Sequence, residues 1–284
     1  MLNLSKLKQI PMRGYTGIIL VIIFWTLNWS LDGLRTQWAF FPLWLGYILA
    51  ADSIVFLRKG SSLFSRSKKS FIELFIFSIP VWWLFEILNY FTKNWIYLGR
   101  EYFTDIQFFL LASLSFSTVI PAVFETAELI SAFKRAGNKT SKKIILTKRA
   151  SAYLLLIGII TLICIIIFPE YFYFLIWVSL YLIIDPLNFI LGKKSLFQYL
   201  SLGNWKPVSS LIIGCLVCGF FWEMWNYFSY PKWIYILPGV NFLHVFEMPL
   251  PGYLGYIPFS LELYAIYNFI DGTLLKRKTE IIIF

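Results

Sequence analysis

The stretch WLFEILNYFTKNWIY, residues 83–97, decides how this chain is read, because its pattern occurs twice. Residues 222–235 repeat it as WEMWNYFSYPKWIY, nearly half a chain later. In both copies a glutamate lies in a strongly apolar run, three residues before an asparagine. An ionisable residue in such a run marks a functional site by default, and an internal repeat indicates a duplicated unit.

The correspondence extends outward on both sides of this stretch. Each copy has an aspartate eight residues after a tryptophan, and each has a glutamate four residues after a proline. The shared acids form three pairs: Asp52 and Asp185, Glu86 and Glu223, Glu125 and Glu262. We therefore predict a tandem duplication with one repeat in residues 1–133, a basic linker at 134–149 and a second repeat in residues 150–284.

Composition sets the class of the protein. Hydrophobic residues make up 59% of the 284 residues and charged residues only 14%, which leaves too little polar surface for a water-soluble globule. Continuous apolar runs predict an all-α, polytopic membrane helix bundle of about eight transmembrane helices, each long enough to cross about 30 Å of hydrocarbon. The expected spans are residues 15–31, 38–57, 71–91, 106–131, 150–168, 171–191, 207–229 and 249–272. Four helices per repeat is an even number, so the two repeats should run parallel.

The basic residues predict the orientation in the membrane. With both termini in the cytoplasm, all but four of the 25 Lys and Arg residues face inward, the exceptions being Arg35, Lys93, Arg100 and Lys232. We therefore expect a multi-pass protein of the cell membrane with both termini cytoplasmic. Topology and contact with anionic membrane lipid account for the net charge of +10, so no nucleic-acid partner is expected. The oligomeric state is left open.

Other classes of chemistry lack their residues. A single histidine, His244, excludes histidine-box metal sites, and we expect no metal and no cofactor. Cys215 and Cys218 share a helix face, but no second pair accompanies them, so they are interpreted as small packing residues. The polar interior is almost entirely carboxylate and amide.

The repeated acids are therefore the candidate site. Glu86 and Asn89 lie on one helix face, as do Glu223 and Asn226, so that each amide can orient the neighbouring acid. Tyr90 and Tyr227 each lie one turn from a glutamate, and Trp222 is adjacent. We expect the six acids to meet between the helices, where burial and mutual repulsion favour protonated carboxyl groups. The alternative is that they only tie helices together through hydrogen bonds.

The second repeat resembles a known family. Residues 225–227 (WNY), residues 232–235 (KWIY), and residues 254–258 (LGYIP) leading to Glu262 are similar to motifs of the integral-membrane lycopene cyclases, of the heterodimeric or fused type. The resemblance covers about residues 70–270 and is fainter in the first repeat. Two departures stand out: Asn226 occupies the position of a family aspartate, and one glutamate replaces an adjacent acid pair after the proline.

The resemblance implies proton-initiated cyclisation of a carotenoid or other isoprenoid. A buried acid protonates a double bond, aromatic rings stabilise the carbocation, and a second carboxylate removes a proton. Glu223 and Glu262 would be acid and base, matched by Glu86 and Glu125, with Asn89, Asn226, Tyr90, Tyr227, Trp222, Asp52 and Asp185 around a hydrophobic isoprenoid-type ligand. Two alternatives remain open: a cation- or proton-coupled transporter, and a non-catalytic relative that binds an isoprenoid or lipid.

Overall fold

The computed structural model describes residues 10–133, 142–277 and 281–284, and these residues are mostly helical. The α-helices are α1 (Met12–Ser30), α2 (Thr36–Lys59), α3 (Leu63–Arg66), α4 (Lys68–Thr92), α5 (Asp105–Phe116), α6 (Val119–Phe133), α7 (Lys148–Ile167), α8 (Pro169–Phe172), α9 (Ile176–Ile190), α10 (Leu196–Ser201), α11 (Lys206–Tyr227) and α12 (Tyr256–Ile270). Shorter helical turns are η2 (Arg100–Tyr102), η3 (Tyr173–Leu175), η4 (Leu250–Gly255) and the π-helical η5 (Asp271–Leu275). The expected linker at 134–149 lies partly outside the described residues.

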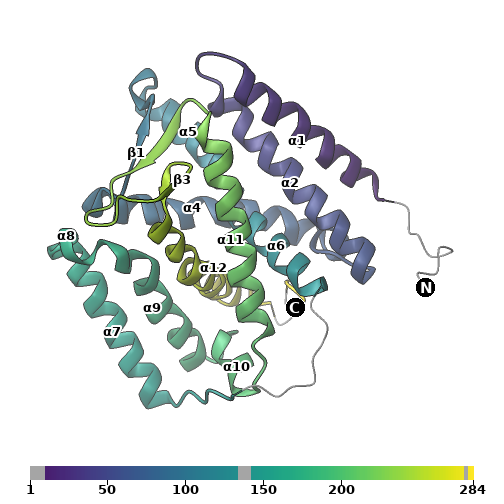
Figure 1. The fold of residues 1–284 in the computed structure, drawn as a ribbon. Helices are drawn as coiled ribbons and strands as arrows, with labels where there is room; N and C mark the ends of the chain where they lie inside the picture. Colours follow the sequence, from purple (N-terminus) through teal and green to yellow (C-terminus); the bar gives the residue numbers. More distant parts are fainter. Residues whose placement is uncertain (1–9, 134–141, 278–280) are drawn as a thin grey trace.

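Two antiparallel helix pairs form opposite ends of the molecule (Figure 1): α1 packs along α2, and α7 packs along α9. Small residues permit the close approach. A Cβ at Gly17 would lie 2.6 Å from the carbonyl oxygen of Gly46, and one at Gly158 would lie 2.9 Å from the backbone nitrogen of Ile183. Helices in an apolar medium associate through such close packing because the surrounding lipid is itself apolar.

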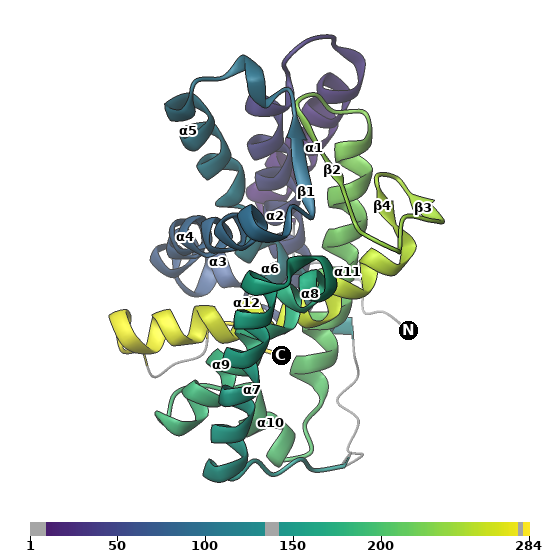
Figure 2. The same cartoon turned by 90° about the vertical axis from the view of Figure 1, so that its left-hand side faces the viewer.

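The remaining long helices lie between these pairs. Helix α6 packs against α2, α4 and α11, and α12 packs against α9 and α11. Figure 2 shows α12 crossing the middle of the molecule between α4 and the α7/α9 pair. A short turn at Ser117 and Thr118 separates α5 from α6, so the span expected at 106–131 is interrupted, although α5 and α6 together still form one candidate membrane span, Asp105–Phe133. The interior where these helices meet holds the largest buried side chains, among them Trp44, Trp225 and Tyr267.

Two short strands join the two halves of the chain. Strand β1 (Trp95–Leu98) follows α4, strand β2 (Lys232–Tyr235) follows α11, and they pair antiparallel with Trp95 opposite Tyr235 and Tyr97 opposite Trp233. A second small pair, β3 (His244–Val245) with β4 (Met248–Pro249), lies in the following loop. The sequence predicts only loops at these places, because runs of four residues are too short to show strand periodicity.

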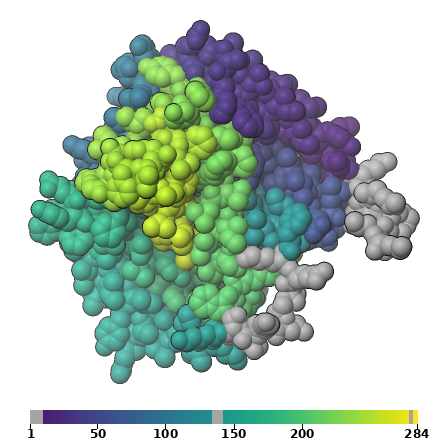
Figure 3. All heavy atoms as spheres, viewed as in Figure 1, coloured from purple at the N-terminus to yellow at the C-terminus, as the bar shows by residue number. Residues whose placement is uncertain are grey.

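The outer helix faces are apolar. Ile18, Ile22, Ile160 and Ile163 on α1 and α7 are each at least 48% exposed, and the space-filling view shows α1 along one edge of the molecule (Figure 3). Such surfaces are typical of helices surrounded by lipid.

Six segments among the described residues are long and apolar enough to cross a bilayer: Thr36–Lys59, Lys68–Thr92, Asp105–Phe133, Lys148–Ile167, Pro169–Ile190 and Lys206–Tyr227. These confirm a multi-pass, all-α membrane protein. The spans expected at 15–31 and 249–272 form α1, of 19 residues, and α12, of 15 residues, which are not among the six. A count of eight therefore stays a prediction.

Candidate functional site: an aromatic cavity between two glutamates

Each repeated asparagine ties the end of its helix to the strand that follows. The Asn89 amide donates to the carbonyl of Trp95 over 2.9 Å and accepts from its N–H over 3.2 Å. The Asn226 amide makes the same two bonds with Trp233, at 2.7 and 3.0 Å. Neither amide bonds a glutamate, in contrast to the expectation from their spacing. Instead, each satisfies a backbone group that would otherwise be left without a partner near the helix end, and so fixes the strand.

The strands present four aromatic side chains on one face. Residues two apart on a strand point the same way, and residues opposite each other in an antiparallel pair share a face. The register therefore puts Trp95 and Tyr97 of β1 beside Tyr235 and Trp233 of β2, an arrangement we call the strand quartet. Ile96, between the two aromatic residues of β1, is 40% exposed on the other face.

Glu86 on α4 lies behind one half of the quartet. Its Oε1 accepts from the hydroxyl of Tyr97 at 2.5 Å and from the indole N–H of Trp95 at 3.1 Å. A third donor, the indole of Trp82, comes from the preceding turn of α4 at 2.9 Å. Burial, and next the adjacent Glu86, raises the pKa of the Tyr97 hydroxyl well above its ordinary value, so Tyr97 keeps its proton at neutral pH.

Glu223 on α11 occupies the corresponding place behind the other half. Its Oε1 accepts from the hydroxyls of Tyr235 and Tyr256, each at 2.7 Å, and the Tyr235 oxygen accepts from the indole of Trp233 at 2.9 Å. Burial, and next the adjacent Glu223, raises the pKa of Tyr235 well above its ordinary value. Glu223 is completely buried, whereas Glu86 is only partly buried.

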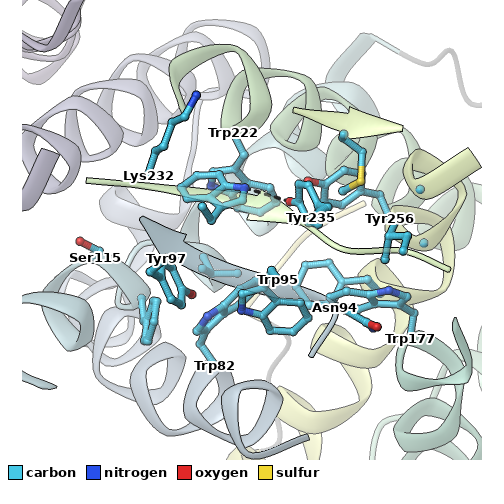
Figure 4. A pocket seen from close by; sticks show the side chains of 18 of the residues that line it. Trp82, Asn94, Trp95, Tyr97, Ser115, Trp177, Trp222, Lys232, Tyr235 and Tyr256 are labelled. Atoms are coloured by element: carbon cyan, nitrogen blue, oxygen red, sulfur yellow. Dashed lines mark hydrogen bonds between the residues drawn. The ribbon is translucent and has the colours of Figure 1, made fainter. Parts of the chain in front are cut away.

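A cavity of about 510 Å³ lies against the quartet and is lined from both halves of the chain. Fifteen of its lining residues are aromatic, including all four members of the quartet. Figure 4 shows Trp82, Trp95 and Tyr97 in one group and Trp222, Tyr235 and Tyr256 in another, with Trp177 beside Trp95. The Trp177 ring stacks on that of Trp95, with centroids 5.8 Å apart. The volume and the apolar lining are those of a site for a hydrophobic small molecule.

The two cations on the cavity wall already have partners. Lys232 forms an ion pair with Glu247, and Arg100 forms one with Asp105. Neither glutamate of the site forms an ion pair with a Lys or Arg within the described ranges. The carboxyl groups of Glu86 and Glu223 are therefore held by neutral donors alone.

The repeated aspartates lie away from this cavity. Asp52 accepts from the backbone N–H of Phe64 over 3.0 Å, and Asp185 accepts from that of Leu196 over 3.0 Å, so each caps the short helix that follows its own long helix. Asp52 is also paired with Arg13 at 2.5 Å. Both contacts are those of a structural role.

Glu125 and Glu262 also lie beyond the cavity wall. Val119 of α6 and Phe259 of α12 line the cavity, and these two acids are further along the same helices. Glu125 is fully buried beside the carboxyl groups of Asp52 and Glu128. Glu262 accepts from the backbone N–H groups of Leu180 and Tyr181 on α9. The six acids thus do not meet in one pocket; only Glu86 and Glu223 bond to its walls.

The aromatic candidates divide in the same way. Trp222 lines the cavity and packs against Tyr256, with ring centroids 6.0 Å apart. Tyr90 and Tyr227 are 77% and 40% exposed and are not part of the lining.

The strand quartet is what the sequence interpretation missed. Trp95, Tyr97, Trp233 and Tyr235 are typical of the residues that sit at a membrane interface, and that interpretation conceals their place in the cavity. A signal was nevertheless present: both copies have a tryptophan and a tyrosine two residues apart, at nearly the same distance after the glutamate. A spacing of two is that of side chains on one face of a strand.

Comparisons with known proteins supply no assignment, since no family model, no curated protein and no solved structure matches this chain. The function must therefore be argued from the geometry of the cavity.

Proposed function

We propose that this protein is a cofactor-independent membrane isomerase, which takes an isoprenoid or related polyene from the bilayer and rearranges it by proton transfer, as the lycopene cyclases that it resembles do. The single observation that carries the proposal is the presence of two equivalent Glu–Tyr hydrogen bonds, Glu86 with Tyr97 and Glu223 with Tyr235, at the wall of one aromatic cavity.

The wall suits each stage of such a reaction. The apolar lining favours a hydrocarbon chain and excludes water, which would otherwise trap a carbocation. Indole, phenol and phenyl faces attract positive charge as it develops. A carboxyl group hydrogen-bonded to a tyrosine hydroxyl can deliver its proton through that hydroxyl, since the hydroxyl both donates and accepts.

The same geometry disfavours the transporter alternative. A coupled transporter needs polar groups along a path between the two membrane faces. Two of the buried acids that do not line the cavity are engaged in ion pairs, Asp52 with Arg13 and Glu128 with Arg66. A non-catalytic binding protein would fit the cavity but gives no reason for two acids at its wall.

We further propose that α1 and the segment around α12 complete eight spans in two parallel repeats, with both ends of the chain in the cytoplasm. The equivalent Asn–Trp bonds, Glu–Tyr bonds and aspartate caps in the two halves support the duplication. The side of the membrane is tested by labelling single cysteines placed in the exposed loops of the intact protein.

The activity is tested with purified protein in liposomes that contain an acyclic carotenoid, with products separated by chromatography. We expect conversion by the wild type and a loss of at least about 100-fold in Glu223→Gln and Tyr235→Phe, the usual contribution of general acid catalysis. Glu170→Gln and Tyr171→Phe alter exposed residues and serve as matched controls. Full turnover by both site variants would refute the assignment, and uptake driven by a proton gradient without conversion would replace it with transport.

A further inference from the structure

The two glutamates differ in the kind of donor that surrounds them. Glu86 Oε1 receives three hydrogen bonds, from Trp82, Trp95 and Tyr97. An indole N–H can only donate, so two of these three partners could not accept a proton from a neutral carboxyl group. Three donors directed at one oxygen favour the carboxylate form. Glu86 is only partly buried whereas Glu223 is fully buried, so a negative charge costs less on Glu86 than on Glu223.

Glu223 has the opposite surroundings. The two hydrogen bonds that Glu223 Oε1 accepts come from the hydroxyl groups of Tyr235 and Tyr256, which can accept as well as donate, and the indole of Trp233 is a weaker donor beside them. Because Tyr235 already accepts from Trp233, Tyr256 is the partner that is free to turn and accept the carboxyl proton. The second carboxyl oxygen, Oε2, is buried and has no hydrogen-bond partner among the described residues. A charged oxygen in that position would be far more costly than a neutral one.

The charges around Glu223 act in the same direction. The charge of Glu247 acts on Glu223, and Glu247 is itself paired with Lys232. No cation within the described ranges forms an ion pair with Glu223. Full burial without a counter-charge therefore keeps this carboxyl group neutral.

We propose that the two glutamates divide the reaction between them: Glu223 carries the proton that starts it, and Glu86 remains a carboxylate that steadies the cation and removes the proton that ends it. This inference rests on the proposed function and deepens it.

The reaction consumes and releases one proton, so each cycle leaves the number of protons on the protein unchanged. The proton of Glu223 moves to the oxygen of a neighbouring tyrosine hydroxyl at the cavity wall, as that hydroxyl's own O–H bond breaks and a C–H bond forms on one carbon of a terminal double bond, which leaves a carbocation. The electrons of a second double bond close the ring. A neighbouring C–H bond then breaks, its electrons form the new double bond, and its proton passes to the oxygen of Tyr97 as the Tyr97 hydroxyl proton moves to Glu86. Substrate and product are isomers, and return of the proton from Glu86 to Glu223 resets the site.

The division can be tested without substrate, by infrared spectroscopy of the carbonyl stretch that only a protonated carboxyl group gives. We expect Glu223→Gln to lose one such band from the wild-type spectrum, whereas Glu86→Gln and the control Glu170→Gln keep all of them. Loss of a band in Glu86→Gln, or none in Glu223→Gln, would overturn the proposal.

A second pair of variants keeps the test valid should Glu223→Gln fail to fold. Tyr256→Phe removes one hydrogen bond from Glu223 and should shift that band, while Trp82→Phe removes one from Glu86 and should shift none. The opposite result would overturn the proposal. These spectra need no turnover. A wild-type protein that converts no polyene but shows the expected bands would therefore refute the proposed function and still support a neutral Glu223 and a charged Glu86.

Discussion

Replacement of Asn226 by alanine should loosen the second half of the site without touching a glutamate. The amide makes both hydrogen bonds to the peptide of Trp233, at 2.7 and 3.0 Å, and is 1% exposed. Side-chain hydrogen bonds in membrane proteins are worth about 0.6 kcal/mol on average, and a buried peptide group left without a partner costs about 1–3 kcal/mol. We therefore expect Asn226→Ala to lower the free energy of unfolding by about 1–3 kcal/mol.

The loss is measured by denaturant unfolding of the detergent-solubilised protein, followed by tryptophan fluorescence. Asn241→Ala is the matched control, because Asn241 is exposed and bonds only His244. Since Tyr235 lies two residues beyond Trp233 on the same strand, conversion of a polyene should fall as well. If Asn226→Ala unfolds at the same denaturant concentration as Asn241→Ala, the amide does not fix the strand and the reasoning is refuted.

Two further changes test the packing that supports the site. Arg66→Ala removes the bidentate partner of the buried Glu128 carboxylate, which then retains only partial compensation from the ion pair with Lys59 at 3.8 Å, and should lower the free energy of unfolding by up to about 3 kcal/mol. Lys69→Ala, at a highly exposed side chain, is the control. Gly17→Val puts side-chain atoms against the backbone of Gly46 and Ala50 and should lower the free energy of unfolding by about 1–3 kcal/mol. The control Thr16→Val, on the exposed face of α1, should leave it nearly unchanged. Equal melting temperatures for the two variants would contradict the close α1–α2 contact.

The sequence predicts the class of this fold well and its local geometry less well. Apolar runs and basic loops are sufficient to predict membrane helices, because the bilayer imposes length and composition on each span. The break between α5 and α6 escapes prediction, since Ser117 and Thr118 are compatible with a continuous helix. The turn shows in the bond of the Thr118 N–H, which reaches the carbonyl of Ser115 three residues back at 3.2 Å rather than the carbonyl four residues back.

The site is predicted in part for the same reason. The repeat singles out Glu86 and Glu223, which bond to the cavity wall, but it also singles out Asp52 and Asp185, which cap short helices. Repetition marks residues that both halves need, whether for chemistry or for folding. The pairing of β1 with β2 depends on contacts between residues more than a hundred positions apart, which no local pattern contains.

An antiparallel strand pair is superimposed on itself by a half turn. Here one strand comes from each half, and the tyrosine of each strand bonds the glutamate of its own half, Tyr97 with Glu86 and Tyr235 with Glu223. Two identical copies of a single half could therefore close the same ribbon and enclose the same chamber as a symmetric dimer. In a single chain, unlike in such a dimer, the residues around the two acids can change independently. The different neighbours of Glu86 and Glu223 are an example of such a difference.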